Sequence, residues 1–196
     1  DPFAGATADE IEDTRPWCEI IRQWSTLHPE FAYLPRKFKI AVSGSDSDRA
    51  ASQVHDIGLH LYHNEVGEMG FEVLVGGGLG RTPVIGKTVR QFLEPQELLS
   101  YLDAILRVYN LNGRRDNKYK ARIKILVNAV GIDTFAEMVE AEWQYSKGKE
   151  LRLPEAEIER VKGFFKAPNY LPTAHSELTE SELENTFSEH PQFATW

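Results

Sequence analysis

The chain has 196 residues, and its 22 Lys and Arg against 30 Asp and Glu give a formal net charge of −8. Hydrophobic residues make up 41% and charged residues 27%, a globular balance that excludes wholesale disorder. No apolar run approaches the roughly 18 residues that a membrane span needs, and the N-terminus carries no export signal, so we expect a cytoplasmic protein without a membrane partner. The single cysteine, Cys18, excludes an internal disulfide and a metal centre held by several thiolates of this chain.

The first predicted elements are an N-terminal arm and a helix. Residues 1–15 are acidic and lack a clear period, which is typical of an arm. Pro16 suits the first turn of a helix. Apolar residues then recur at helical spacing, at Trp17, Ile20, Ile21, Trp24 and Leu27. The pattern predicts a helix over 16–28 with an aromatic buried face, ended by Pro29.

Strands follow this helix. Residues 38–43 alternate between apolar and polar side chains, which predicts one strand. Residues 55–62 and 70–75 are two further apolar runs separated by a polar loop, and we expect them to form an antiparallel hairpin.

A run of glycines ends the predicted hairpin. Gly76, Gly77 and Gly78 have no evident packing use, and each costs conformational entropy on folding. They fit a backbone that approaches a ligand closely or presents N–H groups to an anion. A wide turn is the alternative. The GGGLG run is not the GxGxxG fingerprint, which disfavours NAD binding.

The second half of the chain is predicted to be helical. Pro95 opens a helix with a strong apolar face that ends at Gly113. Another helix runs from residue 133 to about 146, and residues 154–165 form one short helix. The remaining residues are Pro-rich, acidic and poorly periodic. The fold class expected from these elements is α+β, with a mixed or antiparallel sheet flanked by helices.

We expect three parts along the chain. Residues 1–15 form the N-terminal arm, residues 16–147 form one compact domain, and residues 148–196 form a tail that packs on something outside this chain.

Two basic segments stand out in this acidic chain. Residues 34–39 (LPRKFK) carry three positive charges and no negative one, and residues 114–124 (RRDNKYKARIK) carry six basic residues against Asp116. An acidic protein with such segments is expected to use them on a particular anion, because a general polyanion binder would be basic overall. The alternative is that they are merely solvated.

The second basic segment is predicted to begin a helix that continues through the apolar residues 123–130. If it is helical from its start, Arg115, Lys118 and Arg122 share one stripe, which can face a ligand. Lys120 and Lys124 then lie on another stripe, which can face water.

LPRKFKIAVSG followed by GFEVLVGGGLG resembles the siroheme-dependent nitrite/sulfite reductase family. The opening DPFAGATADEIEDTRPW and the stretch GRRDNKYKARIKILVNAVGIDTF are similar to flanking segments of the same domain, so the resemblance covers about residues 1–145. It implies an α+β fold and a siroheme bridged to a 4Fe-4S cluster. The implied activity is the six-electron reduction of nitrite to ammonia or of sulfite to sulfide, with ferredoxin or a flavoprotein reductase as electron donor.

The resemblance also implies roles for particular residues. Lys37 and Lys39 match the lysines that bind the substrate anion, and Arg36 matches the arginine beside them, which serves the cofactor's carboxylates. The glycine loop that lies against the macrocycle corresponds to Gly76, Gly77 and Gly78. Weaker matches to cofactor-binding cations are Arg115, Lys118 and Arg122. Lysines at positions i and i+2 of a strand project from the same face, so Lys37 and Lys39 can converge on one small oxyanion while Phe38 turns to the core.

The sequence departs from the family's pattern in its cysteines. The cluster cysteines of the family form two close pairs beyond this domain, and none is present here. We therefore expect a central portion of a larger reductase that supplies one wall of the site, has the remainder of the polypeptide as its partner, and is inactive and colourless alone. No residue of this chain is expected to ligate a metal.

Two alternatives from other classes remain open. One is a non-catalytic module that binds a polyanion or a tetrapyrrole through residues 36–39 and 114–124. Nucleic acid would be its natural polyanion, but the net charge and the lack of an aromatic-studded basic strand disfavour that partner. The other is a paralogue that kept the fold and lost the cofactor.

Overall fold

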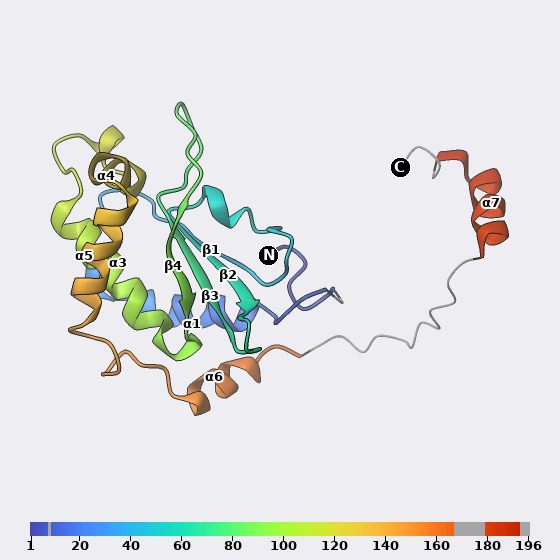
Figure 1. Ribbon diagram of the computed structural model, residues 1–196, viewed down its shortest axis with the longest axis horizontal. Helices are drawn as coiled ribbons and strands as arrows, with labels where there is room; N and C mark the ends of the chain where they lie inside the picture. The colour runs from blue at the N-terminus through green and yellow to red at the C-terminus, as the bar shows by residue number, and fades with distance from the viewer. Residues whose placement is uncertain (8, 167–178, 193–196) are drawn as a thin grey trace.

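A four-stranded mixed sheet forms the centre of the computed structural model, which describes residues 1–7, 9–166 and 179–192. Its strands are β1 (Ile40–Ser43), β2 (Ile57–His63), β3 (Met69–Val75) and β4 (Lys87–Leu93), in the spatial order β1-β2-β3-β4. β1 is parallel to β2, and the other two pairs are antiparallel. The predicted α+β class with a mixed sheet and the predicted hairpin of residues 55–75 are therefore confirmed (Figure 1).

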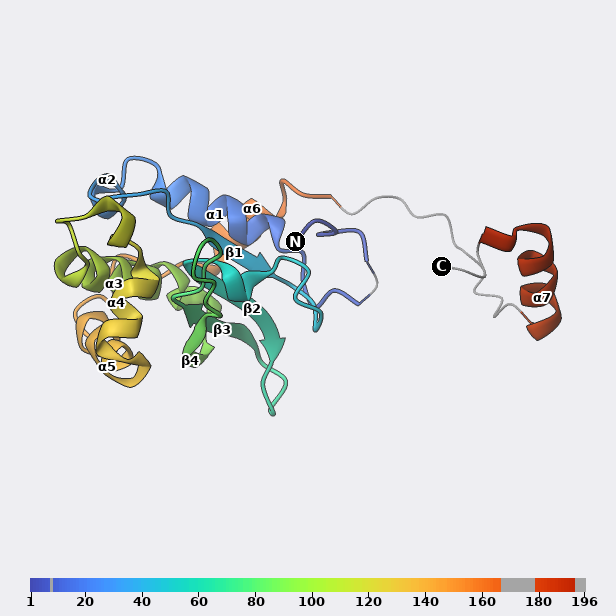
Figure 2. The ribbon, with the colours of Figure 1, turned by 90° about the horizontal axis from the view of Figure 1, so that it is seen from above.

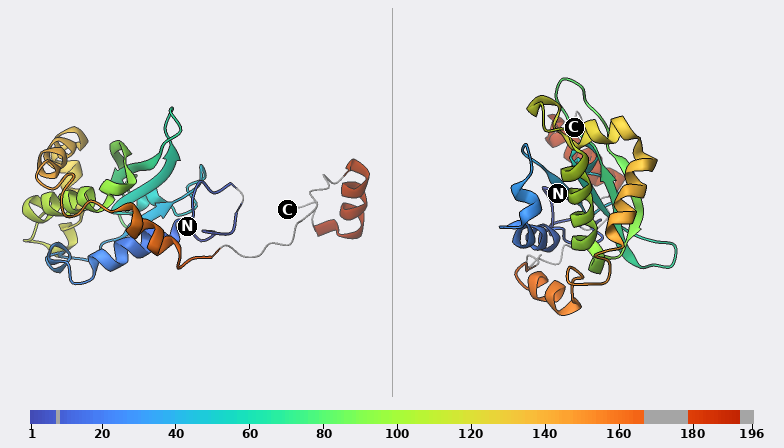
Figure 3. Two further views of the ribbon diagram at one scale, coloured as in Figure 1. Left: turned by 90° about the horizontal axis from the view of Figure 1, so that it is seen from below. Right: turned by 90° about the vertical axis from the view of Figure 1, so that its left-hand side faces the viewer.

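One face of the sheet forms one side of the hydrophobic core. Alternate residues of β2 and β3 point to it and are fully buried, namely Ile57, Leu59, Leu61, Phe71, Val73 and Val75. Helices α1 (Arg15–Ser25), α3 (Leu98–Asn112) and α5 (Ile132–Trp143) lie over this face as a layer (Figure 3, right). The Trp17 and Phe71 rings meet edge to face at 5.2 Å, and the Tyr101 and Trp143 rings do so at 5.1 Å. These contacts join α1 to β3 and α3 to α5.

The remaining helices are short. They are α2 (Pro29–Ala32), α4 (Ile123–Val130), α6 (Glu155–Lys162) and α7 (Glu180–Glu189). Single 3-10 turns are η1 (Ser52–Val54), η2 (Pro95–Glu97) and η3 (Lys118–Lys120). α7 contains no buried residue.

The first predicted helix is too long by one turn. α1 ends at Ser25, and Leu27 has a left-handed backbone with φ of 63°. Pro29 does not end a helix but begins α2, because the His28 side chain accepts a hydrogen bond from the Glu30 N–H at 3.3 Å and caps the new helix.

The basic segment is not helical from its start, so the predicted stripe of Arg115, Lys118 and Arg122 is wrong. Residues 114–117 have no regular structure, and the Asn117 side chain accepts from the Tyr119 N–H at 2.9 Å to start η3. Arg122 then has an extended backbone as the N-cap of α4. The polar segment offers no apolar stripe that could pack as a helix.

The core continues beyond residue 147. Leu153, Ile158 and Val161 are buried, and α6 lies beside α1 (Figure 2). Lys162 of α6 forms an ion pair with Glu12, which lies shortly before α1. The division into arm, domain and tail remains a prediction, and the tail residues 167–178 and 193–196 lie outside the described residues.

Candidate functional site

The segments that carry the predicted site residues meet at one end of the sheet. Ile40 at the start of β1 pairs with Ile57 at the start of β2, and Ile57 pairs with Val75 at the end of β3. Residues 36–39 precede the first of these and the glycines follow the last. This is the upper end of the sheet in Figure 1, from which the β3–β4 loop projects and beside which α4 lies.

Asp56 joins these segments, and it is a residue to which the sequence analysis assigned no role. Its side chain is 3% exposed, and its carboxylate accepts from the Lys39 N–H at 3.0 Å. The Arg122 guanidinium lies 3.8 Å from the other carboxylate oxygen, and the Asp56 carbonyl accepts from the Gly76 N–H at 3.0 Å. Burial raises the pKa of Asp56, while the Lys39 N–H and the charges of Arg122 and Lys39 oppose that rise.

Lys37 and Lys39 are exposed, and Phe38 between them turns to the core. Their segment has no regular structure and precedes β1, which begins at Ile40 rather than at Phe38 as predicted. The Phe38 ring packs against the Tyr109 ring of α3 at 5.8 Å between centroids. The side chains of Lys37 and Lys39 thus face solvent, while the packing of Phe38 against α3 holds their segment in place.

Tyr109 is the second residue that sequence reasoning missed. Its hydroxyl donates to the Ala121 carbonyl, directly before Arg122, and the Arg115 guanidinium lies 5.3 Å above its ring. Burial raises the pKa of Tyr109, so the hydroxyl stays a donor at neutral pH. The buried Tyr109 ring therefore contacts both Phe38 and Arg115, and its hydroxyl holds the residue directly before Arg122.

The glycines have packing reasons within the chain, contrary to the expectation that they have none. A Cβ at Gly77 would lie 2.4 Å from the Gln53 carbonyl oxygen, and one at Gly76, where φ is 78°, would lie 3.2 Å from Val127. The Gly78 N–H donates to the Val84 carbonyl at 2.9 Å. At least two of the three N–H groups, those of Gly76 and Gly78, are therefore used inside the chain, which weakens the argument that the loop presents N–H groups to an anion.

Lys124 does not face water as predicted. It is 8% exposed, and its Nζ donates to the Thr82 carbonyl at 2.7 Å across the β3–β4 loop. A Cβ at Gly78 would lie 3.3 Å from the Lys124 Cδ. Lys124 thereby fastens the loop to α4.

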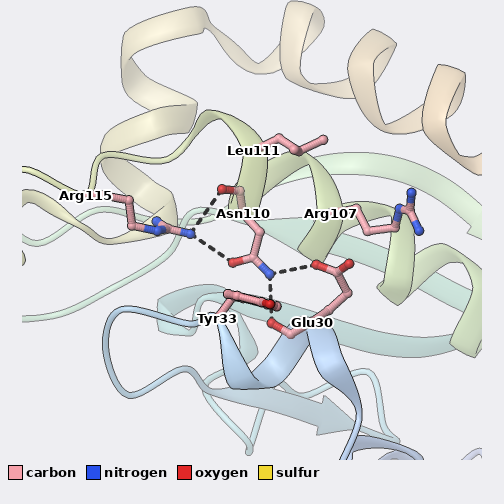
Figure 4. A pocket seen from close by; sticks show the side chains of 6 residues that line it. All are labelled: Glu30, Tyr33, Arg107, Asn110, Leu111 and Arg115. Atoms are coloured by element: carbon pink, nitrogen blue, oxygen red, sulfur yellow. Dashed lines mark hydrogen bonds between the residues drawn. The ribbon is translucent and has the colours of Figure 1, made fainter.

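Arg115 and Lys118 have other contacts than Arg122, which faces Asp56. Arg115 donates to the Asn110 carbonyl and to its side-chain oxygen, the latter at 2.9 Å, and lines a hollow of roughly 330 Å³ at the end of α3 (Figure 4). In the same hollow, the Asn110 amide donates to Glu30 at 2.8 Å. The Lys118 ammonium lies 5.3 Å from the Tyr119 ring.

Cations without a carboxylate partner gather at this end of the sheet. No ion pair or side-chain hydrogen bond to a described residue is formed by Arg36, Lys37, Lys39, Arg81 or Lys87, all of them exposed. Elsewhere in the described ranges most arginines pair with carboxylates, as Arg49, Arg90, Arg107, Arg152 and Arg160 do. Unpaired cations from three segments fit a ligand that carries several carboxylates.

The described residues do not fit an iron–sulfur cluster. Among them, no group of three or more His, Cys, Asp or Glu side chains could hold a metal ion. Cys18, the single cysteine of the sequence, is exposed on α1. This chain alone therefore lacks the thiolates that such a cluster needs.

A model of the "Nitrite and sulphite reductase 4Fe-4S domain" family matches residues 1–147. The chain belongs to this family. It is 35% identical over 143 residues to sulfite reductase (ferredoxin) 1 of Mycolicibacterium paratuberculosis, covering 72% of this chain and 25% of that protein. It is 32% identical over 144 residues to the ferredoxin–nitrite reductase of Leptolyngbya laminosa, covering 71% of this chain and 28% of that protein.

A solved structure agrees with these relatives. The structure of the Mycobacterium tuberculosis NirA protein matches with a TM-score of 0.66 and 32% identity, covering 74% of this chain and 26% of that chain. The chain thus spans about a quarter of the length of the relatives it matches. In the part of the chain that the structure describes, no helix is long and apolar enough to cross a membrane.

Proposed function

We propose that the chain is part of a siroheme and iron–sulfur reductase that reduces nitrite to ammonia or sulfite to sulfide. The observation that carries the proposal is the group of exposed, unpaired cations at the end of the sheet, to which Arg36, Lys37 and Lys39 belong. Family membership supports it, since the two curated relatives are a sulfite and a nitrite reductase. Nitrite and sulfite both suit this one group of cations, because both are small oxyanions.

Siroheme and the cluster supply the electrons when bound, and the cluster is held by residues other than those described here. The work of this chain is electrostatic. Arg36 is assigned to the carboxylates of the cofactor, because its planar guanidinium can bind a carboxylate through two parallel hydrogen bonds. Arg122, Arg115 and Lys118 are further candidates, of which Arg122 is linked to the glycine loop through Asp56.

Lys37 and Lys39 are assigned to the substrate anion. Two exposed ammonium groups in one segment stabilise the negative charge of nitrite or sulfite, and each Nζ can donate one of the two protons with which an oxygen leaves as water. Gly76, Gly77 and Gly78 are assigned to the close approach of the cofactor, for which a loop without side chains leaves room.

The proposed partners follow from the same assignment. Ferredoxin is the proposed electron donor because both relatives carry it in their names, and a flavoprotein reductase is the alternative. The remainder of the reductase is the proposed source of the cluster cysteines, and the cytoplasm is the proposed compartment.

The test uses the complete reductase, with turnover of nitrite and of sulfite and siroheme content measured together. Lys37→Met and Lys39→Met are each expected to lower turnover by about 100-fold or more, as removal of a positioned charge or proton donor does. Siroheme content should stay near that of the wild type. Lys149→Met is the matched control, because Lys149 is exposed on another part of the surface and donates to the Tyr145 carbonyl. Wild-type turnover in both site variants would remove the assigned role. A protein that binds siroheme without turnover would favour the tetrapyrrole-binding alternative.

A further inference from the structure

Asp56 is the one buried carboxylate at the end of the sheet that, among the described residues, touches three segments of the candidate site. Its carboxylate bonds the Lys39 N–H and faces Arg122, and its own carbonyl bonds the Gly76 N–H. The Lys39 carbonyl in turn accepts from the Ile57 N–H at 3.2 Å. Lys39 is therefore fixed on both sides of its Cα, at its N–H and at its carbonyl.

Burying a carboxylate to satisfy one backbone N–H costs free energy, because the charge must be removed from water. The Arg122 guanidinium at 3.8 Å and the positive charge of Lys39 offset part of that penalty. A neutral Asn or Ser could accept from the Lys39 N–H without it. What the carboxylate adds is a negative charge between the lysine segment and the arginine, which holds two positive groups near each other at one end of the sheet.

We propose that Asp56 is a positioning residue that fixes Lys39 for binding of the substrate anion, with Arg122 as the counter-ion of its carboxylate. This inference rests on the proposed function. Asp56 does not touch the anion itself, since it is almost fully buried beneath the exposed lysine segment. It acts through Lys39, whose backbone it holds by the hydrogen bond at 3.0 Å.

The test is a double-mutant cycle in the complete reductase, read from the shift of the siroheme absorption bands as sodium nitrite or sodium sulfite is added. Asp56→Asn, which keeps the shape and removes the charge, should raise the Kd of the anion by about tenfold, as loss of a supporting residue around a site does. If Asp56 acts through Lys39, the same change made in Lys39→Met should raise the Kd by less than about threefold. Siroheme content should be unchanged in Asp56→Asn.

Asp103→Asn is the matched control, because Asp103 is a buried aspartate of α3 at 6% exposure that contacts His28 rather than the site. It should leave the anion Kd at the wild-type value. Hydrogen exchange of the siroheme-free protein gives an independent readout, since Asp56→Ala, which removes the acceptor of the Lys39 N–H, should speed exchange of that amide and Asp103→Ala should not.

Four results would overturn the inference. They are a wild-type Kd in Asp56→Asn, an equal fold-change in both lysine backgrounds, unchanged exchange of the Lys39 amide in Asp56→Ala, and an Asp56→Asn protein that fails to accumulate while Asp103→Asn accumulates. The last would show that Asp56 holds the fold rather than the site. Failure of the proposed function looks different, because the wild-type protein would then show no siroheme bands or no shift with either anion.

Discussion

Gly77 is the position where the structure makes its sharpest mutational prediction. A Cβ there would lie 2.4 Å from the Gln53 carbonyl oxygen and 2.6 Å from that of His55, whereas real Cβ contacts essentially never fall below 3.0 Å. Both obstacles are backbone atoms of the η1 region, so Gly77→Ala forces the loop and η1 apart by at least about 0.6 Å. The Gln53 carbonyl also accepts from the Gly86 N–H at 2.6 Å, and this bond would be strained.

The expected loss follows from these two effects. Overpacking of a tight site costs about 1–3 kcal/mol, and a weakened hydrogen bond adds about 1 kcal/mol. For a chain of this size each kcal/mol lowers Tm by roughly 2–4 °C, so the total corresponds to a fall of roughly 4–16 °C.

The assay is thermal unfolding followed by circular dichroism, with Gly78→Ala as the neighbouring control. A Cβ at Gly78 meets the Lys124 Cδ at 3.3 Å, the flexible side chain of a lysine rather than backbone. Its Tm should fall by no more than about 4 °C, since the strain is below about 1 kcal/mol. Equal Tm values for the two variants would refute the reasoning and return the glycines to a role in ligand approach alone.

Three further predictions concern the fold and the isolated chain. Glu97 is buried, and although burial raises its pKa, hydrogen bonds from Ser100, Arg152 and the Gly148 N–H lower it overall. A depressed carboxyl pKa adds stability above the unfolded-state pKa that is lost as the pH falls through the folded-state value. Glu97→Gln should therefore lower Tm at pH 7 by roughly 2–12 °C, for about 1–3 kcal/mol, and the deficit should shrink below about pH 4; a constant deficit across that range would contradict the assignment. Tyr109→Phe leaves the Ala121 carbonyl without its donor and should lower the free energy of unfolding in urea by about 1–3 kcal/mol, whereas an unchanged midpoint would show that the hydroxyl is dispensable. The 196-residue chain expressed alone in cells that make siroheme should be colourless and should not reduce nitrite or sulfite, and either a colour or turnover would show that it needs no further residues.

The parts of the fold with strong periodicity were predictable from the sequence. The hairpin of β2 and β3 shows two apolar runs, and α3 shows a long apolar face, so their types were right. β4 received no assignment, because Arg90 and Gln91 interrupt its apolar alternation; Arg90 is accommodated by Glu140 of α5 at 2.7 Å, a contact that no local pattern reveals.

The candidate site was predictable only in part. The LPRKFK and glycine motifs identified segments that do meet at one end of the sheet. Asp56 and Tyr109 were missed because their partners are distant in sequence, with Lys39 lying 17 positions from Asp56 and Ala121 lying 12 positions from Tyr109. The helical stripe of Arg115, Lys118 and Arg122 failed because charge spacing alone does not stabilise a helix without an apolar face.

The absorption spectrum of the complete reductase, purified from cells able to make siroheme, tests the central claim most directly. The unpaired cations at the end of the sheet are assigned to a carboxylate-rich cofactor and to a small oxyanion beside it. We expect siroheme bands that shift when nitrite or sulfite is added. A colourless protein without iron would contradict it and would leave a cofactor-free anion-binding relative with the same fold.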